Sequence, residues 1–127
     1  MSNNITLQNP KYQSCIDACC RCMECCESCC TSCMMGMTNM DTKNMGMMSR
    51  PMMMMRDCST MCMTAATMMS RGSENVKQMC NMCAEMCEMC AQECDKMSNQ
   101  QAMMTEQIKQ CAEMCRECAQ ECRNMTR

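Results

Sequence analysis

Cysteines recur at helical spacing in four segments of this chain. In the first segment, residues 15–33, six of the nine cysteines are spaced at steps of 4, 3, 4, 3 and 4. Because an α-helix turns by about 100° per residue, these thiols share one face of a helix. Three further segments repeat the pattern, one of them in shortened form. The four thiol stripes are Cys15, Cys19, Cys22, Cys26, Cys29 and Cys33; Cys58 and Cys62; Cys80, Cys83, Cys87, Cys90 and Cys94; and Cys111, Cys115, Cys118 and Cys122.

This spacing suits a shared metal ion better than a disulfide. Cysteines three or four residues apart on a helix have Cβ atoms about 5–6 Å apart, whereas a disulfide needs Cβ atoms about 3.8 Å apart. Two thiolates on one metal lie about 4–5 Å apart when each metal–sulfur bond is about 2.3 Å. The stripes therefore predict metal–thiolate sites.

Ligand type and charge indicate which metal. The chain has no histidine, so thiolate and thioether are the candidate ligands, and soft sulfur selects Cu(I), zinc or iron–sulfur clusters. A zinc ion with four thiolates leaves a dianion, which is costly inside a bundle. One Cu(I) per thiolate is neutral, and thioethers also suit Cu(I). We expect several Cu(I) ions per chain, with a metallothionein-like zinc or mixed-metal scavenger as the alternative.

Two redox functions are weaker alternatives. Cys19, Cys22, Cys25 and Cys29 match the spacing of bacterial ferredoxins, but no proline follows Cys29 and no second such motif exists. A thiol oxidoreductase usually carries its CxxC pair next to a strand, and here every such pair lies inside a helical pattern. We therefore expect a protein that is not an enzyme.

Composition limits the core and the partners. The 127 residues include 20 Cys and 26 Met, no Phe or Trp, and Tyr12 as the sole aromatic residue, so the core must be built from sulfur-containing side chains. A net charge of −2 with mixed signs excludes a basic surface for nucleic acid.

The run 52–55 is too short to cross a membrane. The first residues lack the features of a signal peptide, so a cytoplasmic location with reduced thiols is expected.

Local signals predict the elements. Pro10 suits the first turn of a helix, Pro51 suits the start of another, and Gly72 suits a helix end. Ser98 and Gln101 form a candidate capping box. Short connections make neighbouring helices antiparallel, which predicts an all-α, up-down-up-down four-helix bundle with a Cys-lined core in a single domain, 1–127. Its expected parts are a loose arm at 1–8, helices at about 9–35, 49–71, 73–97 and 99–126, and a Met-rich connection at 36–48.

Three segments carry a resemblance to a known family. CIDACCRCMECCESCCTSC, MCNMCAEMCEMCAQEC and CAEMCRECAQEC resemble helices of the cytosolic bacterial copper storage proteins, and the likeness covers about residues 12–35 and 56–126. The resemblance implies a four-helix bundle assembled as a homotetramer, whose interior cysteines hold many Cu(I) ions for storage and detoxification. A copper chaperone is a candidate delivery partner.

The chain departs from the family in three respects. Cys20, Cys25 and Cys30 are additional cysteines, the Met-rich connection is longer, and the histidines often found near one end of the bundle are absent. Cys20 lies about 140° from Cys15 around the helix, so we expect it to point outward or into a subunit interface. Cys25 and Cys30 flank the stripe, and we expect them among the metal ligands.

Extending each stripe past its last cysteine distinguishes the two ends of the bundle. One end is expected to carry thioethers through which Cu(I) passes, because thioether binds Cu(I) more weakly than thiolate and adds no charge. These candidates are Met37, Met55, Met97, Met103 and Met104. The opposite end is expected to be a bulkier plug made of Tyr12, Met69, Val76 and Met125.

Overall fold

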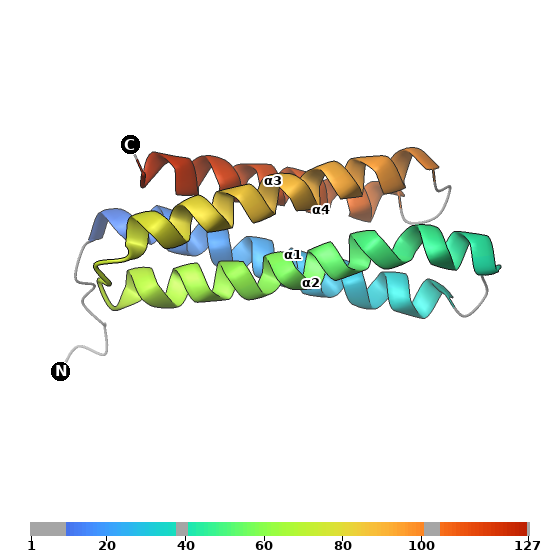
Figure 1. Ribbon diagram of the computed structural model, residues 1–127, viewed down its shortest axis with the longest axis horizontal. Helices are drawn as coiled ribbons and strands as arrows, with labels where there is room; N and C mark the ends of the chain where they lie inside the picture. The colour runs from blue at the N-terminus through green and yellow to red at the C-terminus, as the bar shows by residue number, and fades with distance from the viewer. Residues whose placement is uncertain (1–9, 38–40, 101–104, 127) are drawn as a thin grey trace.

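Four long helices follow a short 3-10 helix. The computed structural model describes residues 10–37, 41–100 and 105–126. Within these residues the helices pack as a ring in which α1 contacts α2, α2 contacts α3, α3 contacts α4, and α4 contacts α1. Figure 1 shows neighbouring helices running antiparallel, so the up-down-up-down bundle is confirmed. The elements are η1 (Pro10–Tyr12), α1 (Gln13–Gly36), α2 (Thr42–Ser70), α3 (Val76–Gln100) and α4 (Thr105–Asn124).

Sulfur-containing side chains fill the core, as predicted. Every thiol of the four stripes is fully buried, and the largest buried side chains are four methionines and Ile108. Seven alanines accompany them, such as Ala84 and Ala112, and their small side chains let the helix backbones approach. Thiols and thioethers here take the place of the branched aliphatic residues that fill most cores.

The turn between α2 and α3 is closed by backbone hydrogen bonds. The Ser73 N–H donates to the Met68 carbonyl at 3.0 Å, and the Gly72 N–H donates to the Met69 carbonyl at 3.1 Å. Gly72 has a φ of 66°, which a glycine adopts without the steric cost of a Cβ atom. This short turn brings α3 back antiparallel to α2.

The expected connection over 36–48 and the expected start of the second helix are wrong. Helix α2 already begins at Thr42, and Pro51 lies inside it. The physical reason is burial, because Met48 is only 1% exposed and a helical path places its side chain in the core. Pro51 has no backbone N–H to donate to the preceding turn of the helix. In that turn the Ser49 Oγ donates a hydrogen bond to the Gly46 carbonyl at 3.0 Å.

The predicted capping role of Ser98 is also wrong. Helix α3 continues to Gln100, and the Ser98 Oγ donates to the Asp95 carbonyl at 3.0 Å within the same helix. Gln101 lies outside the described residues, and α4 is described from Thr105.

Candidate metal centre

The four thiol stripes meet along the axis of the bundle. Each sulfur in one continuous series lies 3.6–4.0 Å from the next, and the series passes through all four helices. We call this series the thiol row. In order of contact it runs Cys15, Cys122, Cys19, Cys118, Cys62, Cys87, Cys58, Cys22, Cys115, Cys26 and Cys111.

Four compact groups occur in and beside the thiol row. In each group all sulfur atoms lie within 4.8 Å of one another, and all members are buried. Cys22, Cys118 and Cys122 each belong to two groups, so neighbouring groups share ligand atoms. The groups are Cys19, Cys83, Cys118 and Cys122; Cys22, Cys26, Cys58 and Cys115; Cys22, Cys62, Cys87 and Cys118; and Cys15, Cys80 and Cys122.

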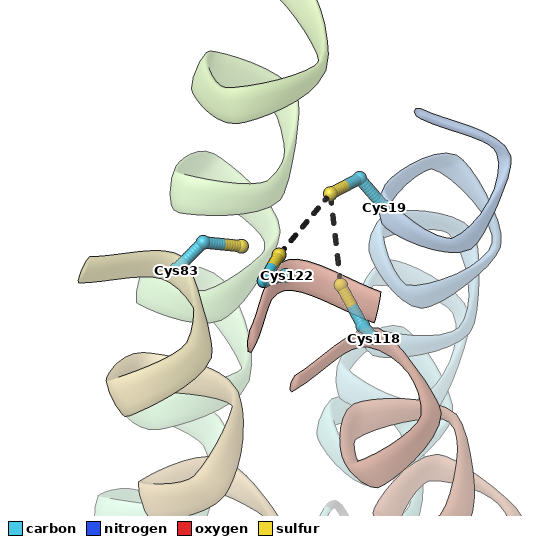
Figure 2. A group of neighbouring side chains, drawn as sticks. All are labelled: Cys19, Cys83, Cys118 and Cys122. Carbon is cyan, nitrogen blue, oxygen red and sulfur yellow. Dashed lines mark hydrogen bonds between the residues drawn. The ribbon is translucent and has the colours of Figure 1, made fainter. Parts of the chain in front are cut away.

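The first group illustrates how separate helices supply one group. Figure 2 shows Cys19 of α1 facing Cys118 and Cys122 of α4, with Cys83 of α3 beside the same space. The Cys19 sulfur lies 3.6 Å from that of Cys118 and 4.0 Å from that of Cys122. An ion held here would link three helices.

These separations fit metal ligands and not disulfides. All 20 cysteines are free thiols, and the shortest sulfur–sulfur contact in the row is 3.6 Å, whereas a disulfide bond is about 2.05 Å long. Two sulfurs bound to one ion at about 2.3 Å lie about 4 Å apart when the angle at the metal is near 120°. The thiols are thus already close to the spacing of a shared metal.

Burial among other thiols holds protons on several of these sulfurs. The hydrogen bond between Cys80 and Cys122 acts to lower the pKa of Cys80. The hydrogen bond between Cys80 and Cys15 acts in the opposite direction, and together with burial it raises the pKa of Cys80 to about 12. Hydrogen bonds with Cys111 and Cys22, followed by burial, raise the pKa of Cys115. Metal binding must release these protons, because the thiolate is the ligand.

Six more buried stripe thiols lie outside the thiol row, two of them in the compact groups and four beyond the Cys111 end of the row. Cys29, Cys90 and Cys94 interact with Cys111 at its end, and Cys29 also interacts with Cys33. The sulfur interior therefore extends past Cys111 towards the end of the bundle where α1 finishes.

The three additional cysteines of α1 have different environments. Cys20 is exposed, which agrees with the outward direction predicted for it. Cys25 is half-buried, and its hydrogen bond with Cys111 followed by burial raises its pKa. Cys30 is 4% exposed, and burial is the main cause that raises its pKa.

The two ends of the bundle differ in side chains. Where α1 ends, Met48, Met55 and Met97 are buried and Met37 is half-buried against them. Met103 and Met104 lie outside the described residues. At the opposite end Met69 and Val76 are buried, Tyr12 and Met125 are partly buried, and the Cys80 sulfur lies 3.8 Å from the Met69 Sδ.

Met48 was missing from the predicted thioethers. It precedes Met55 by seven residues, which is two helical turns along the same face. This spacing is a signal for Met48, but Pro51 favours a helix start, which places Met48 in the connection before the helix and outside the stripe.

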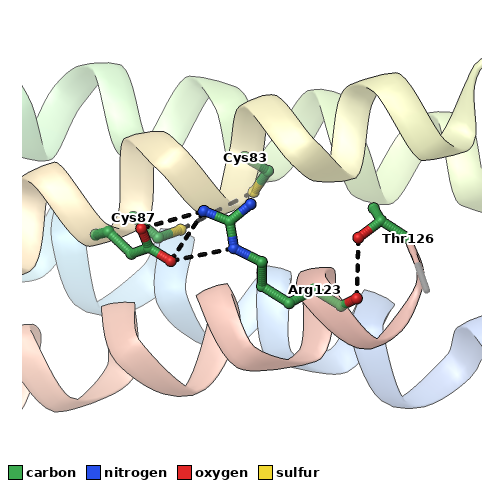
Figure 3. Close-up of polar contacts among 5 residues, drawn as sticks. Cys83, Cys87, Arg123 and Thr126 are labelled. Carbon is green, nitrogen blue, oxygen red and sulfur yellow. Dashed lines mark hydrogen bonds and ion pairs between the residues drawn. The ribbon is translucent and has the colours of Figure 1, made fainter.

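Charged residues pair on the outside of the bundle, close to the thiols. The Arg123 guanidinium contacts both carboxylate oxygens of Glu88, at 3.1 and 3.2 Å, and so joins α4 to α3. Figure 3 draws Arg123 together with Cys83 and Cys87 of α3, whose sulfurs lie 3.9 Å apart. Among the described residues, none of the helices has the length and apolarity needed to span a membrane.

Comparison with known proteins identifies the family. The sequence matches the copper storage protein family over residues 8–127. Apo copper storage protein 3 from Bacillus subtilis is 30% identical, and the alignment covers 91% of this chain and 99% of that chain with a TM-score of 0.74. The Cu(I)-bound copper storage protein BsCsp3 is also 30% identical, with 92% and 99% covered and a TM-score of 0.77. A search of curated proteins finds no match. With a thiol-lined four-helix bundle and a family match over nearly its whole length, this chain belongs to the copper storage protein family.

Proposed function

We propose that this chain stores many Cu(I) ions in its sulfur interior and thereby sequesters and detoxifies copper. The observation that carries the proposal is the thiol row, with its contacts of 3.6–4.0 Å across all four helices. Buried charge is costly unless it is neutralised, and one Cu(I) per thiolate sums to zero. A row filled in this way accumulates no charge, and the Cu(I)-bound relative BsCsp3 supports the same cargo.

The proposed ligands are the 17 cysteines of the four stripes in the interior of the bundle, joined by thiols beside them. Stripe and flanking thiols differ in burial, so we expect the fully buried ones to bind most tightly. Cys25 and Cys30 are further proposed ligands, and Cys20 is not among the proposed ligands.

Family membership favours a storage role without catalysis, and we propose that the chain catalyses no reaction. The free thiols support a reducing, cytoplasmic location. The family resemblance supports assembly as a homotetramer, with a copper chaperone as the partner that delivers the ions.

Titration of the anaerobic, reduced protein with Cu(I), against a strong Cu(I) chelator, tests the storage function. We expect saturation on the order of 17 to 20 ions per chain, with one thiol proton released for each thiolate formed. Saturation at about four or five ions, or equally tight filling by zinc, would contradict the proposal, because both outcomes are typical of separate four-thiolate sites.

We infer that Cu(I) passes through the end that holds Met37, Met55 and Met97, together with Met103 and Met104. The test replaces Met55, Met97, Met103 and Met104 with Leu, which keeps side-chain volume and removes sulfur. Uptake and chelator-driven removal should slow at nearly full capacity. Met69→Leu is the matched control, because Met69 is equally buried at the opposite end. Parental rates in the fourfold variant would refute this route.

A further inference from the structure

A pocket on the face between α1 and α2 is lined by five sulfur-containing residues. Its volume is about 450 Å³. It lies beside the sulfur interior and opens to solvent, since Met34 is 55% exposed and Met53 is 65% exposed. We call it the sulfur pocket, and its sulfur-containing residues are Cys30, Met34, Met37, Met52 and Met53.

The thiol in this pocket is directed away from the thiol row. The Cys30 Sγ donates to the Met52 carbonyl of α2 at 3.8 Å. It belongs to none of the four compact thiol groups of the described residues. Cys30 is therefore placed to bind an ion together with the surrounding thioethers.

The lining selects for a soft, monovalent ion. Its polar residues are Ser49 and Arg56, and the described lining contains no carboxylate. Hard cations such as Mg²⁺ and Ca²⁺ need oxygen ligands, whereas thiolate and thioether select soft ions such as Cu(I). One thiolate neutralises one Cu(I), and the thioethers add bonds without adding charge.

We propose that the sulfur pocket is an outer Cu(I) site, in which the Cys30 thiolate and the thioethers of Met34, Met37, Met52 and Met53 hold one ion more weakly than the interior does. This proposal rests on the proposed storage function and names an additional site for the same cargo. When the ion binds, the Cys30 thiol releases its proton to solvent as the copper–sulfur bond forms. Exposed methionine side chains have three rotatable bonds, so Met34 and Met53 can close over the ion or swing away.

The pocket also adjoins the interior sites. Cys33 follows Cys30 by three residues, which places their Cβ atoms about 5–6 Å apart on the helix. Cys33 is fully buried and belongs to the sulfur interior. An ion at Cys30 can therefore exchange ligands with Cys33 and move between the outer site and the interior.

Methyl NMR of the full chain, labelled at the methionine ε-methyl groups, tests the outer site. Cu(I) is added anaerobically, first to fill the tight sites and then in further equivalents. We expect the methyl signals of Met34, Met37, Met52 and Met53 to shift with the last, weakly held equivalent. The double variant Met34→Leu/Met53→Leu changes only exposed residues. It should lower the affinity for the last equivalent of Cu(I) at least about tenfold, as loss of a supporting group at a metal site does. Cys30→Ser should abolish it.

The control is Met82→Leu/Met89→Leu, because these two methionines are 48% and 45% exposed on α3, away from the pocket. It should retain the weak equivalent and the methyl shifts. Normal filling of the interior with no shift of the four methyl groups would overturn the outer site, as would equal binding by the pocket variant and the control. A parent that takes up a single ion and shifts the same four methyl groups would overturn bulk storage and support the outer site.

Discussion

Cys20 and Cys22 are two residues apart on α1 and have opposite environments. The Cys22 sulfur is fully buried and lies 3.8 Å from the sulfurs of both Cys58 and Cys115. Cys20 is exposed, and partial burial followed by the charges of Asp17 and Glu24 raises its pKa. The same functional group is thus a core atom at one position and a surface thiol at the other.

Position around the helix, and not residue type, decides which thiols form the interior. The same contrast occurs on α3, where Cys87 is fully buried while the next residue, Glu88, pairs with Arg123 on the surface. If this contrast is correct, perturbing interior thiols should have large effects and perturbing surface groups should have small ones.

Filling the interior with Cu(I) should have the largest effect. Ions that bind only the folded protein stabilise it by about 4 kcal/mol when the ligand concentration is a thousand times its Kd, and many ions act together here. We expect the Tm, measured anaerobically by circular dichroism, to rise strongly with each added equivalent of Cu(I). An unchanged Tm at full loading would show that the bound ions do not join the helices.

High pH should destabilise the apo protein. Cys80 keeps its proton in the folded state up to a pKa of about 12, while an ordinary thiol loses it near 9.0. Between these values the folded state binds more protons than the unfolded state, so stability present below pH 9 is lost as the pH rises towards 12. The loss should be about 1.4 kcal/mol per pH unit for each retained proton.

Urea unfolding at several pH values measures this loss. The Cu(I)-loaded protein serves as the comparison, because its thiol protons have already been released. An apo protein whose stability stayed constant from pH 9 to pH 11 would contradict the proposed retention of protons.

Replacing one interior thiol should cost more than replacing the surface thiol. Cys22→Ser places a hydroxyl among sulfurs, and an unsatisfied buried polar group costs about 1–3 kcal/mol. Cys20→Ser is its matched control, and a surface substitution of this kind changes stability by about 0.5 kcal/mol or less. Chemical denaturation compares the two variants, and equal losses would remove the distinction between interior and surface.

Removing the outer ion pair should have the smallest effect. Both Glu88 and Arg123 are partly exposed, and exposed ion pairs contribute about 0–1 kcal/mol. Glu88→Gln should therefore lower stability slightly and leave the Cu(I) capacity unchanged in the chelator titration. A loss of several ions would mean that the surface pair organises the thiols beneath it.

The periodicity of the cysteines was enough to predict the helices, their inward thiol faces and the outward direction of Cys20. The reason is that the turn of an α-helix is a local property, so spacing along the chain gives direction around the helix axis. The sulfur core also followed from composition, because few other apolar side chains were available. Gly72 likewise indicated the end of α2 through its own backbone preference.

The tertiary structure decided how the helices match. Which thiols meet, such as Cys22 with Cys58 and Cys115, depends on the axial shift and rotation of each helix against its neighbours, which spacing within one helix does not specify. The start of α2 at Thr42 depended on burial of Met48, a long-range packing effect that overrode the local signal of Pro51. The pocket around Cys30 arose in the same way, because α1 and α2 contribute its thioethers from separate parts of the chain.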